Sequence, residues 1–204
     1  MNTRLAASLA LAYPVAVLIG VQAGLPALPL GILATLVLVA SWQSLEPRQR
    51  GLLGILLVLV VTVLTSTPGG TWLMYALPVA ILGGLSALFA RSLRAGHTPL
   101  ITRYALAMGA SDRPPVHRYT RRLTLAWALL CGTLAILSAL LAVLAPTAVW
   151  ALVANGLNYL LLAGLFMLEY PLRSWLLRGE PRHGFLAYLL ELARVDHHRI
   201  LRQP

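Results

Sequence analysis

The sequence predicts an all-α, polytopic membrane protein with about six transmembrane helices and both termini in the cytoplasm. Hydrophobic residues make up 59% of the 204 residues and charged residues only 11%, a balance that soluble domains do not show. All sixteen basic residues are arginines, and they lie at alternate ends of the apolar segments. Because basic residues near a span stay on the cytoplasmic side, one topology accounts for every arginine.

Six apolar segments have the length, or nearly the length, of a membrane span, which needs about 20 residues. In chain order they are residues 5–23, 28–42, 51–66, 72–90, 123–144 and 150–170. The second and third are short, so we expect flanking residues or a locally thinner bilayer to complete them. Arg4 before the first segment also suits a cleaved signal peptide, but the next span follows at once, which favours a helical hairpin.

The hydrophilic connections divide the chain into a membrane domain and a tail. Arginines occur before the first span, after the second, in the loop 91–122 and after the sixth. The remaining connections, 21–29, 66–71 and 145–149, carry no charged residue. We therefore expect a transmembrane domain over residues 1–171 with a basic cytoplasmic loop at 91–122. Residues 172–204 would form a cytoplasmic tail.

Both long cytoplasmic segments contain helix signals. Residues 99–108 predict a short helix with Thr98 as its cap and Pro99 at the first helical position. Asp112 and two prolines predict a chain break over residues 111–115. In the tail, residues 185–201 show an apolar face opposite a charged one, as in an amphipathic helix that lies on the bilayer surface or docks on a partner.

Several function classes lack the residues that they require. A net charge of +10 does not indicate nucleic acid, because the arginines flank apolar spans and no basic folded module is present. A single cysteine rules out an intrachain disulfide, and the lack of lysine rules out a phosphate-binding P-loop. Glu169, His117 and Asp112 are candidate general bases without a nucleophile at motif spacing. We therefore predict no catalytic residues, no metal and no cofactor.

The sixth span carries the polar content of the membrane domain. Asn158 and Glu169 are eleven residues apart, so they nearly eclipse on an α-helix, and Asn155 lies one turn earlier. Asparagine and glutamate are costly against lipid, so this stripe should face the helical bundle. Two interpretations stay open, a packing hydrogen bond with a membrane-edge ion pair, or a polar pocket open to the cytoplasm. The candidate ion-pair partners of Glu169 are Arg173, Arg121 and Arg122.

The cytoplasmic loop supplies a candidate binding surface. Each of its members is an arginine near the predicted membrane edge: Arg103, Arg113, Arg118, Arg121 and Arg122. Such a surface attracts anionic lipid headgroups or an acidic protein.

Residues 118–124 read Arg-Tyr-Thr-Arg-Arg-Leu-Thr, and Trp127, Tyr159, Phe166, Glu169-Tyr170 and Arg173 follow them. This pattern resembles a small family of bacterial inner-membrane proteins of unknown biochemical role. That family is found in aryl-polyene and xanthomonadin-type pigment gene clusters, among ketosynthases, acyl carrier proteins and acyltransferases. The resemblance covers the C-terminal half best. It implies a location in the bacterial inner (plasma) membrane and an acyl carrier protein as a partner.

These observations lead to three hypotheses. The first is a non-enzymatic scaffold or accessory component of a fatty-acyl or polyene-lipid biosynthesis or export pathway. The second is a membrane-embedded enzyme or a flippase accessory that handles an acyl chain between the fifth and sixth spans, in a cavity beside Glu169 that reaches Asn158. The third is a structural subunit whose small-residue faces dock another membrane protein.

Overall fold

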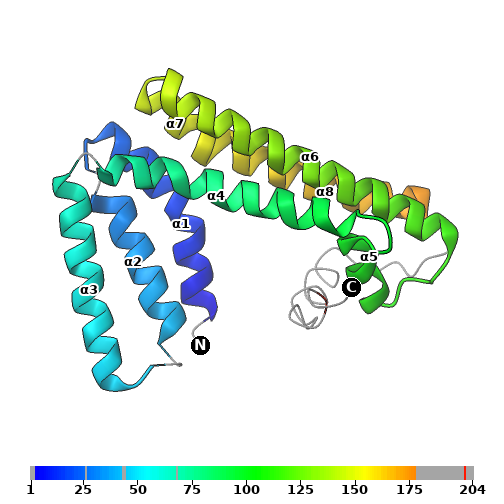
Figure 1. Cartoon of the computed structure of the whole chain (residues 1–204), viewed down its shortest axis with the longest axis horizontal. Helices are drawn as coiled ribbons and strands as arrows, with labels where there is room; N and C mark the ends of the chain where they lie inside the picture. The colour runs from blue at the N-terminus through cyan, green and yellow to red at the C-terminus, as the bar shows by residue number, and fades with distance from the viewer. Residues whose placement is uncertain (1–2, 26, 43–44, 68, 178–199, 201–204) are drawn as a thin grey trace. The chain divides into compact units, whose positions relative to one another are not determined.

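The computed structural model describes residues 3–25, 27–42, 45–67, 69–177 and 200, and every regular element among them is helical (Figure 1). The all-α prediction is therefore confirmed. The elements in chain order are α1 (Thr3–Gln22), α2 (Ala27–Ser41), α3 (Pro47–Ser66), α4 (Gly69–Ser92), α5 (Leu100–Ala107), α6 (Pro114–Leu144), α7 (Thr147–Leu152), the π-helix η1 (Val153–Leu157) and α8 (Asn158–Leu176).

Four helices are long and apolar enough to cross a membrane. They cover Pro47–Ser66, Met74–Ser92, Pro114–Leu144 and Thr147–Arg173. The first two predicted spans correspond to α1 and α2, whose segments with described side chains, Ala12–Gln22 and Ala27–Val39, are apolar but shorter than a span. All six predicted segments thus contain helix, and four of them have both the length and the composition of a span.

Two helix boundaries differ from the sequence prediction. The predicted chain break is present at residues 111–113, which are not helical, but Pro114 and Pro115 already belong to α6, so this helix starts inside the predicted cytoplasmic loop. Proline suits a first helical turn because the amide hydrogen that it lacks has no partner there anyway. The short loop helix α5 begins one residue late, with Pro99 rather than Thr98 at its N-cap.

The sixth predicted span is not one uniform helix. It starts as α7, widens into the π-helix η1 and continues as α8. A π-helix holds one extra residue in a turn and is often found at functional sites. Periodicity of apolar residues gives no sign of this local widening, so the sequence prediction missed it.

The chain divides into two compact units, of which unit 1 comprises Met1–Val79 and Ile136–Tyr159. Within it, α1, α2 and α3 lie side by side (Figure 1), and α1 also packs against α7 and η1. The buried core includes Val17, Met74 and Trp150. The ring of Tyr75 meets Trp150 edge to face at 4.6 Å between centroids, and the Tyr75 hydroxyl bonds Thr147 Oγ1 at 2.8 Å.

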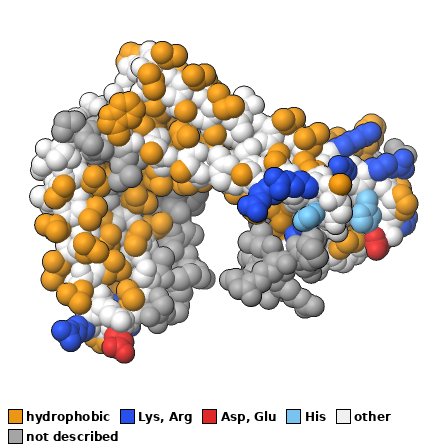
Figure 2. Space-filling model, viewed as in Figure 1, with side chains coloured by type: hydrophobic (Ala, Val, Ile, Leu, Met, Phe, Trp, Pro, Cys, Tyr) orange, Lys and Arg blue, Asp and Glu red, His pale blue; other side chains and the backbone are white. Residues whose placement is uncertain are grey.

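Helix α3 contributes no buried side chain to unit 1. Ile55 and Val58 are 70% and 68% exposed, and hydrophobic side chains cover the visible face of this helix (Figure 2). A helix with many exposed apolar side chains is unfavourable in water and favourable in lipid. The length and composition of α3 are therefore those of a candidate membrane-spanning helix.

Unit 2 comprises Ala80–Ala135 and Leu160–Pro204. Its buried core is formed by Leu82, Cys131, Leu134 and Ala135, with Trp127 packed against them. The predicted amphipathic helix of the tail, residues 185–201, lies outside the described residues except for Ile200.

Candidate functional site

A cavity of about 400 Å³ opens within unit 2, between the second half of α4, α5, the first half of α6 and α8. Its volume lies in the range of small-molecule pockets, roughly 300–1,000 Å³. The lining residues are Leu85, Leu88, Phe89, Leu100, Ile101, Tyr104, Ala105, Met108, Tyr119, Thr120, Leu123, Trp127, Phe166, Glu169 and Arg173. We refer to this cavity as the unit-2 pocket.

Close contact between α4 and α6 positions one side of the pocket. Ser86 Oγ donates to the Ala128 carbonyl at 2.8 Å. A Cβ atom placed on Gly132 would lie only 2.9 Å from Ser86 Oγ, so a larger residue at this crossing would require the Ser86 side chain to shift. Small residues let helix backbones approach closely in a membrane. One helical turn along, the rings of Phe89 and Trp127 stack at 6.0 Å between centroids.

The lining of the pocket is mostly aliphatic and aromatic, and its charged residues both come from α8. Glu169 and Arg173 lie one helical turn apart on α8, and both line the pocket. The Glu169 residue is only 6% exposed. Burial raises the pKa of the Tyr104 hydroxyl, which keeps this group neutral and able to donate a hydrogen bond. An apolar cavity with a few charged or hydroxyl groups suits an amphiphilic ligand.

The two asparagines of the predicted stripe belong to unit 1 and do not line the unit-2 pocket. Both are buried, at 5% exposure for Asn155 and 1% for Asn158. Asn155 Nδ2 donates to the Ala151 carbonyl at 3.3 Å, and Asn158 Nδ2 donates to Ser138 Oγ at 2.9 Å. The Oδ1 atom of Asn158 is buried without a hydrogen-bond partner. The polar stripe is therefore buried at all three positions, but only Glu169 lies at the pocket.

The predicted cationic surface loses one of its five members. Arg103 is 7% exposed, and its Nε donates to the Thr98 carbonyl at 2.7 Å. Its Nη1 donates to the Ile200 carbonyl at 3.2 Å. A buried guanidinium must have its N–H groups satisfied, and α5 turns Arg103 toward these carbonyls. Arg103 is therefore buried rather than part of an exposed surface, and its role in binding an anionic partner stays a prediction.

The other four arginines of that surface are exposed: Arg113, Arg118, Arg121 and Arg122. Figure 2 shows basic side chains gathered over the part of unit 2 that holds α5 and the start of α6. Arg121 Nη2 donates to the Leu93 carbonyl at 3.3 Å, which ties this side chain to the end of α4. Arg118 and Arg122 are thus the better candidates for binding a separate anion.

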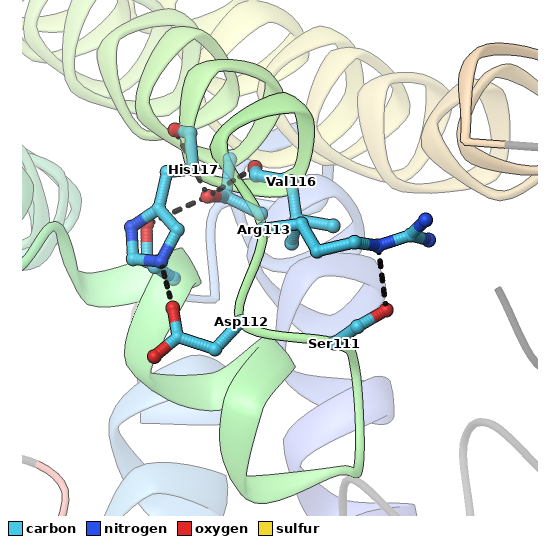
Figure 3. Close-up of polar contacts among 7 residues, drawn as sticks. Ser111, Asp112, Arg113, Val116 and His117 are labelled. Carbon is cyan, nitrogen blue, oxygen red and sulfur yellow. Dashed lines mark hydrogen bonds and ion pairs between the residues drawn. The ribbon is translucent and has the colours of Figure 1, made fainter.

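A histidine–carboxylate pair lies at the start of α6, with Asp112 before the helix and His117 near its first turn. His117 Nε2 lies 2.5 Å from Asp112 Oδ1. Figure 3 shows the Asp112 carboxylate pointing at the His117 ring, while Arg113 turns away toward Ser111. Both members of the pair are exposed, and neither lines the unit-2 pocket. The pair therefore shapes the loop before α6 and is not placed to act on a pocket ligand.

Metal-ligand clusters were sought only among the described residues, where no group of three His, Cys, Asp or Glu side chains is close enough to hold an ion. The tail segment with adjacent histidines, residues 196–198, lies outside that part of the chain. The side chains that line the pocket are likewise poor in metal-binding groups, with Glu169 as the single carboxylate among them.

Sequence reasoning missed the α5 wall of the pocket and the hydroxyl groups that hold it. Thr102 and Thr120 place their Oγ1 atoms 2.6 Å apart, and Thr124 Oγ1 accepts from the Ile101 amide at 3.4 Å. The available signal was a run of hydroxyl residues at four-residue spacing on α6, which lies on one helix face. Hydroxyls in that pattern often bond their own backbone, as Thr120 and Thr124 also do.

The fold and the pocket define a helical protein with four candidate membrane-spanning helices and an amphipathic cavity. Comparison with protein-family models, with curated proteins and with solved structures finds no match to this chain.

Proposed function

We propose that this chain is a six-span protein of the bacterial inner membrane that binds a lipid-like, single-chain amphiphile in the unit-2 pocket. In this proposal both termini are cytoplasmic. The protein is a non-enzymatic accessory component of a fatty-acyl or polyene-lipid pathway. The placement of every arginine at alternate span ends supports the topology, and the resemblance in the C-terminal half supports the pathway.

The observation that carries the proposal is the composition of the pocket. Aromatic and aliphatic side chains from four helices surround a space of about 400 Å³, and Glu169 and Arg173 are its charged lining residues. At about 30 Å³ for each water-sized group, this space holds roughly a dozen non-hydrogen atoms. An acyl chain with a small polar head fits such a site, since the chain contacts the apolar wall and the head meets the charged residues.

A flippase accessory for the same ligand is the second candidate function. The buried amide of Asn158 and the π-helix before it favour this candidate, because interrupted helices with polar groups often mark the substrate sites of transporters. Passage would also require a cavity that reaches Asn158. The unit-2 pocket is lined by Glu169 and not by Asn158, which favours binding over passage.

The exposed arginines at the start of α6 form the second part of the proposal. We assign Arg118 and Arg122 to the anionic headgroups of the cytoplasmic leaflet, where each basic residue contributes about 1 kcal/mol. An acyl carrier protein is the alternative partner. The resemblance implies such a protein in the same pathway, and its acidic surface would attract the arginines.

Filling the pocket is expected to abolish amphiphile binding. Leu88 lines the pocket and is 39% exposed. Leu88→Trp therefore places a larger side chain at the exposed part of the pocket without disturbing the core. Labelling by a diazirine-bearing fatty acid in lipid nanodiscs, mapped by mass spectrometry, should fall about tenfold or more at peptides of α5 and α8. The matched control is Leu129→Trp, on an exposed leucine of α6 outside the pocket, and it should label like the parent. Equal labelling of the two variants would overturn the pocket proposal.

Neutralising Arg118 and Arg122 together is expected to remove bound anionic lipid. Two such residues contribute roughly 2 kcal/mol, so enrichment of phosphatidylglycerol around the protein in polymer-bounded nanodiscs should disappear in the Arg118→Gln, Arg122→Gln variant. Arg48→Gln, at the start of α3, serves as the control and should lose less of the enrichment, because it removes one arginine instead of two. If the lipid is unchanged and recovery of an acyl carrier protein falls instead, the partner is the carrier protein.

A further inference from the structure

Helix α5 forms a complete wall of the unit-2 pocket. Five of its residues or immediate neighbours line the cavity: Leu100, Ile101, Tyr104, Ala105 and Met108. The helix has only eight residues, and isolated helices of that length are not stable in water. Its place at the ends of α4 and α6 (Figure 1) therefore depends on the contacts that it makes with the rest of unit 2.

Those contacts are unusually polar for a helix that covers an apolar cavity. The Leu100 amide donates to Ser92 Oγ at 3.0 Å, and the Ile101 amide approaches Thr124 Oγ1 at 3.4 Å. Thr102 Oγ1 bonds Thr120 Oγ1 at 2.6 Å. Hydrogen bonds of this kind are individually modest, at about 1 kcal/mol each. A few of them can hold α5 in place and still let it separate from α6.

Glycines in the left-handed region flank α5 on both sides. Gly96 has φ +82° and Gly109 has φ +83°, and an added Cβ at either would meet no atom within 4 Å. The space is open, so the requirement for glycine is conformational. Hinge motions concentrate at a few residues beside a rigid element that absorb the change in backbone angles. Gly96 and Gly109 are placed to act as the two hinges of α5.

One contact links α5 to the C-terminal end of the chain. The Arg103 guanidinium, buried at 7% exposure, donates through Nη1 to the Ile200 carbonyl. Ile200 itself is 3% exposed. A charge-assisted hydrogen bond between buried groups is stronger than the neutral bonds around it. The Arg103–Ile200 contact therefore restrains α5 from a residue 97 positions away in sequence.

We propose that α5 is a lid on the unit-2 pocket and that the Arg103–Ile200 contact latches this lid in the closed position. The lid pivots at Gly96 and Gly109, breaks the Thr102–Thr120 bond and admits the amphiphile. Release of Ile200 favours the open state. The inference rests on the proposed function of the pocket and adds the regulation of its access by the C-terminal segment.

A reversible crosslink tests the lid without altering the fold. Cys131 is the single cysteine, so Cys131→Ala, Thr102→Cys, Thr120→Cys carries only the engineered pair. The threonine Oγ1 atoms are 2.6 Å apart, close enough for a disulfide of about 2.05 Å after a small shift. In nanodiscs, oxidation should slow labelling by the diazirine fatty acid about tenfold, and reduction should restore it. Cys131→Ala alone, treated in the same way, is the control and should not change.

Truncation tests the latch. Removing residues 200–204 takes away the Ile200 carbonyl, and we expect labelling severalfold faster than in the full chain. If the disulfide forms completely by mass and labelling stays unchanged, α5 is not a lid, while the pocket proposal stands. If truncation leaves the labelling rate unchanged, the latch is wrong. If no pocket peptide is labelled in either redox state, the proposed function is wrong, and the lid proposal, which depends on it, is wrong as well.

Discussion

Replacing Gly20 with alanine is expected to lower the stability of unit 1 by about 2 kcal/mol, and Gly20→Leu by more. A Cβ atom at this position would lie 2.9 Å from the Leu25 carbonyl oxygen and 2.9 Å from Pro29 Cδ. Neither neighbour can move alone, since the Leu25 carbonyl accepts from the Leu28 amide at 3.1 Å and Pro29 is buried. The Leu25 amide donates to the Gly20 carbonyl at 2.7 Å, so the clash falls on the hydrogen bond that closes the turn. The hairpin of α1 and α2 would then open.

The measurement is the thermal midpoint of the purified protein in detergent. Gly31→Ala is the matched control, because Gly31 lies on α2 and an added Cβ there meets no atom within 4 Å. Alanine is also the better helix former by about 1 kcal/mol, so this variant should unfold at the same temperature as the parent or a higher one. Identical midpoints for Gly20→Ala and Gly31→Ala would show that the hairpin is not packed as described.

The helices were predictable because lipid imposes strong constraints on sequence. Long apolar segments and the sorting of arginines located every helix that holds a predicted span. Their ends were less predictable. Pro114 and Pro115 look like a chain break in isolation, yet they start α6 because proline is tolerated in the first helical turn. Assigning these two prolines to the break left residues 114–122 outside the predicted helix.

The candidate site was predictable only in part, because it depends on which face of each short helix is turned inward. Glu169 and Arg173 were found from spacing along one helix. Arg103 was assigned to an exposed surface, since an arginine in a hydrophilic loop is normally solvated. Its burial depends on carbonyls of Thr98 and Ile200, one of them 97 residues away, and no local pattern reports such a contact.

Introducing a charge at Asn158 is expected to have the other large effect on stability. Asn158 is 1% exposed and lies within the candidate span Thr147–Arg173. A carboxylate at the centre of a span costs about 3 kcal/mol, and Asn158→Asp supplies no cation to offset it. The change would also replace the Nδ2 group, which donates to Ser138 Oγ, with an acceptor, so the serine hydroxyl would have to donate instead of accept. We expect a sharp fall in both the abundance of this variant in membranes and its thermal midpoint.

Asn158→Leu separates the effect of charge from the effect of removing the amide. Leucine has a similar volume, and it eliminates the buried Oδ1 that has no hydrogen-bond partner, whose desolvation is a cost in the parent protein. Ser138 loses its donor, but a serine hydroxyl in a helix can bond a carbonyl of the preceding turn, as Thr120 and Thr124 do in α6. The leucine variant should therefore keep a thermal midpoint close to that of the parent while the aspartate variant falls far below it. A leucine variant as unstable as the aspartate variant would mean that the amide, with its link to Ser138, holds the π-helix region together and that the charge is secondary.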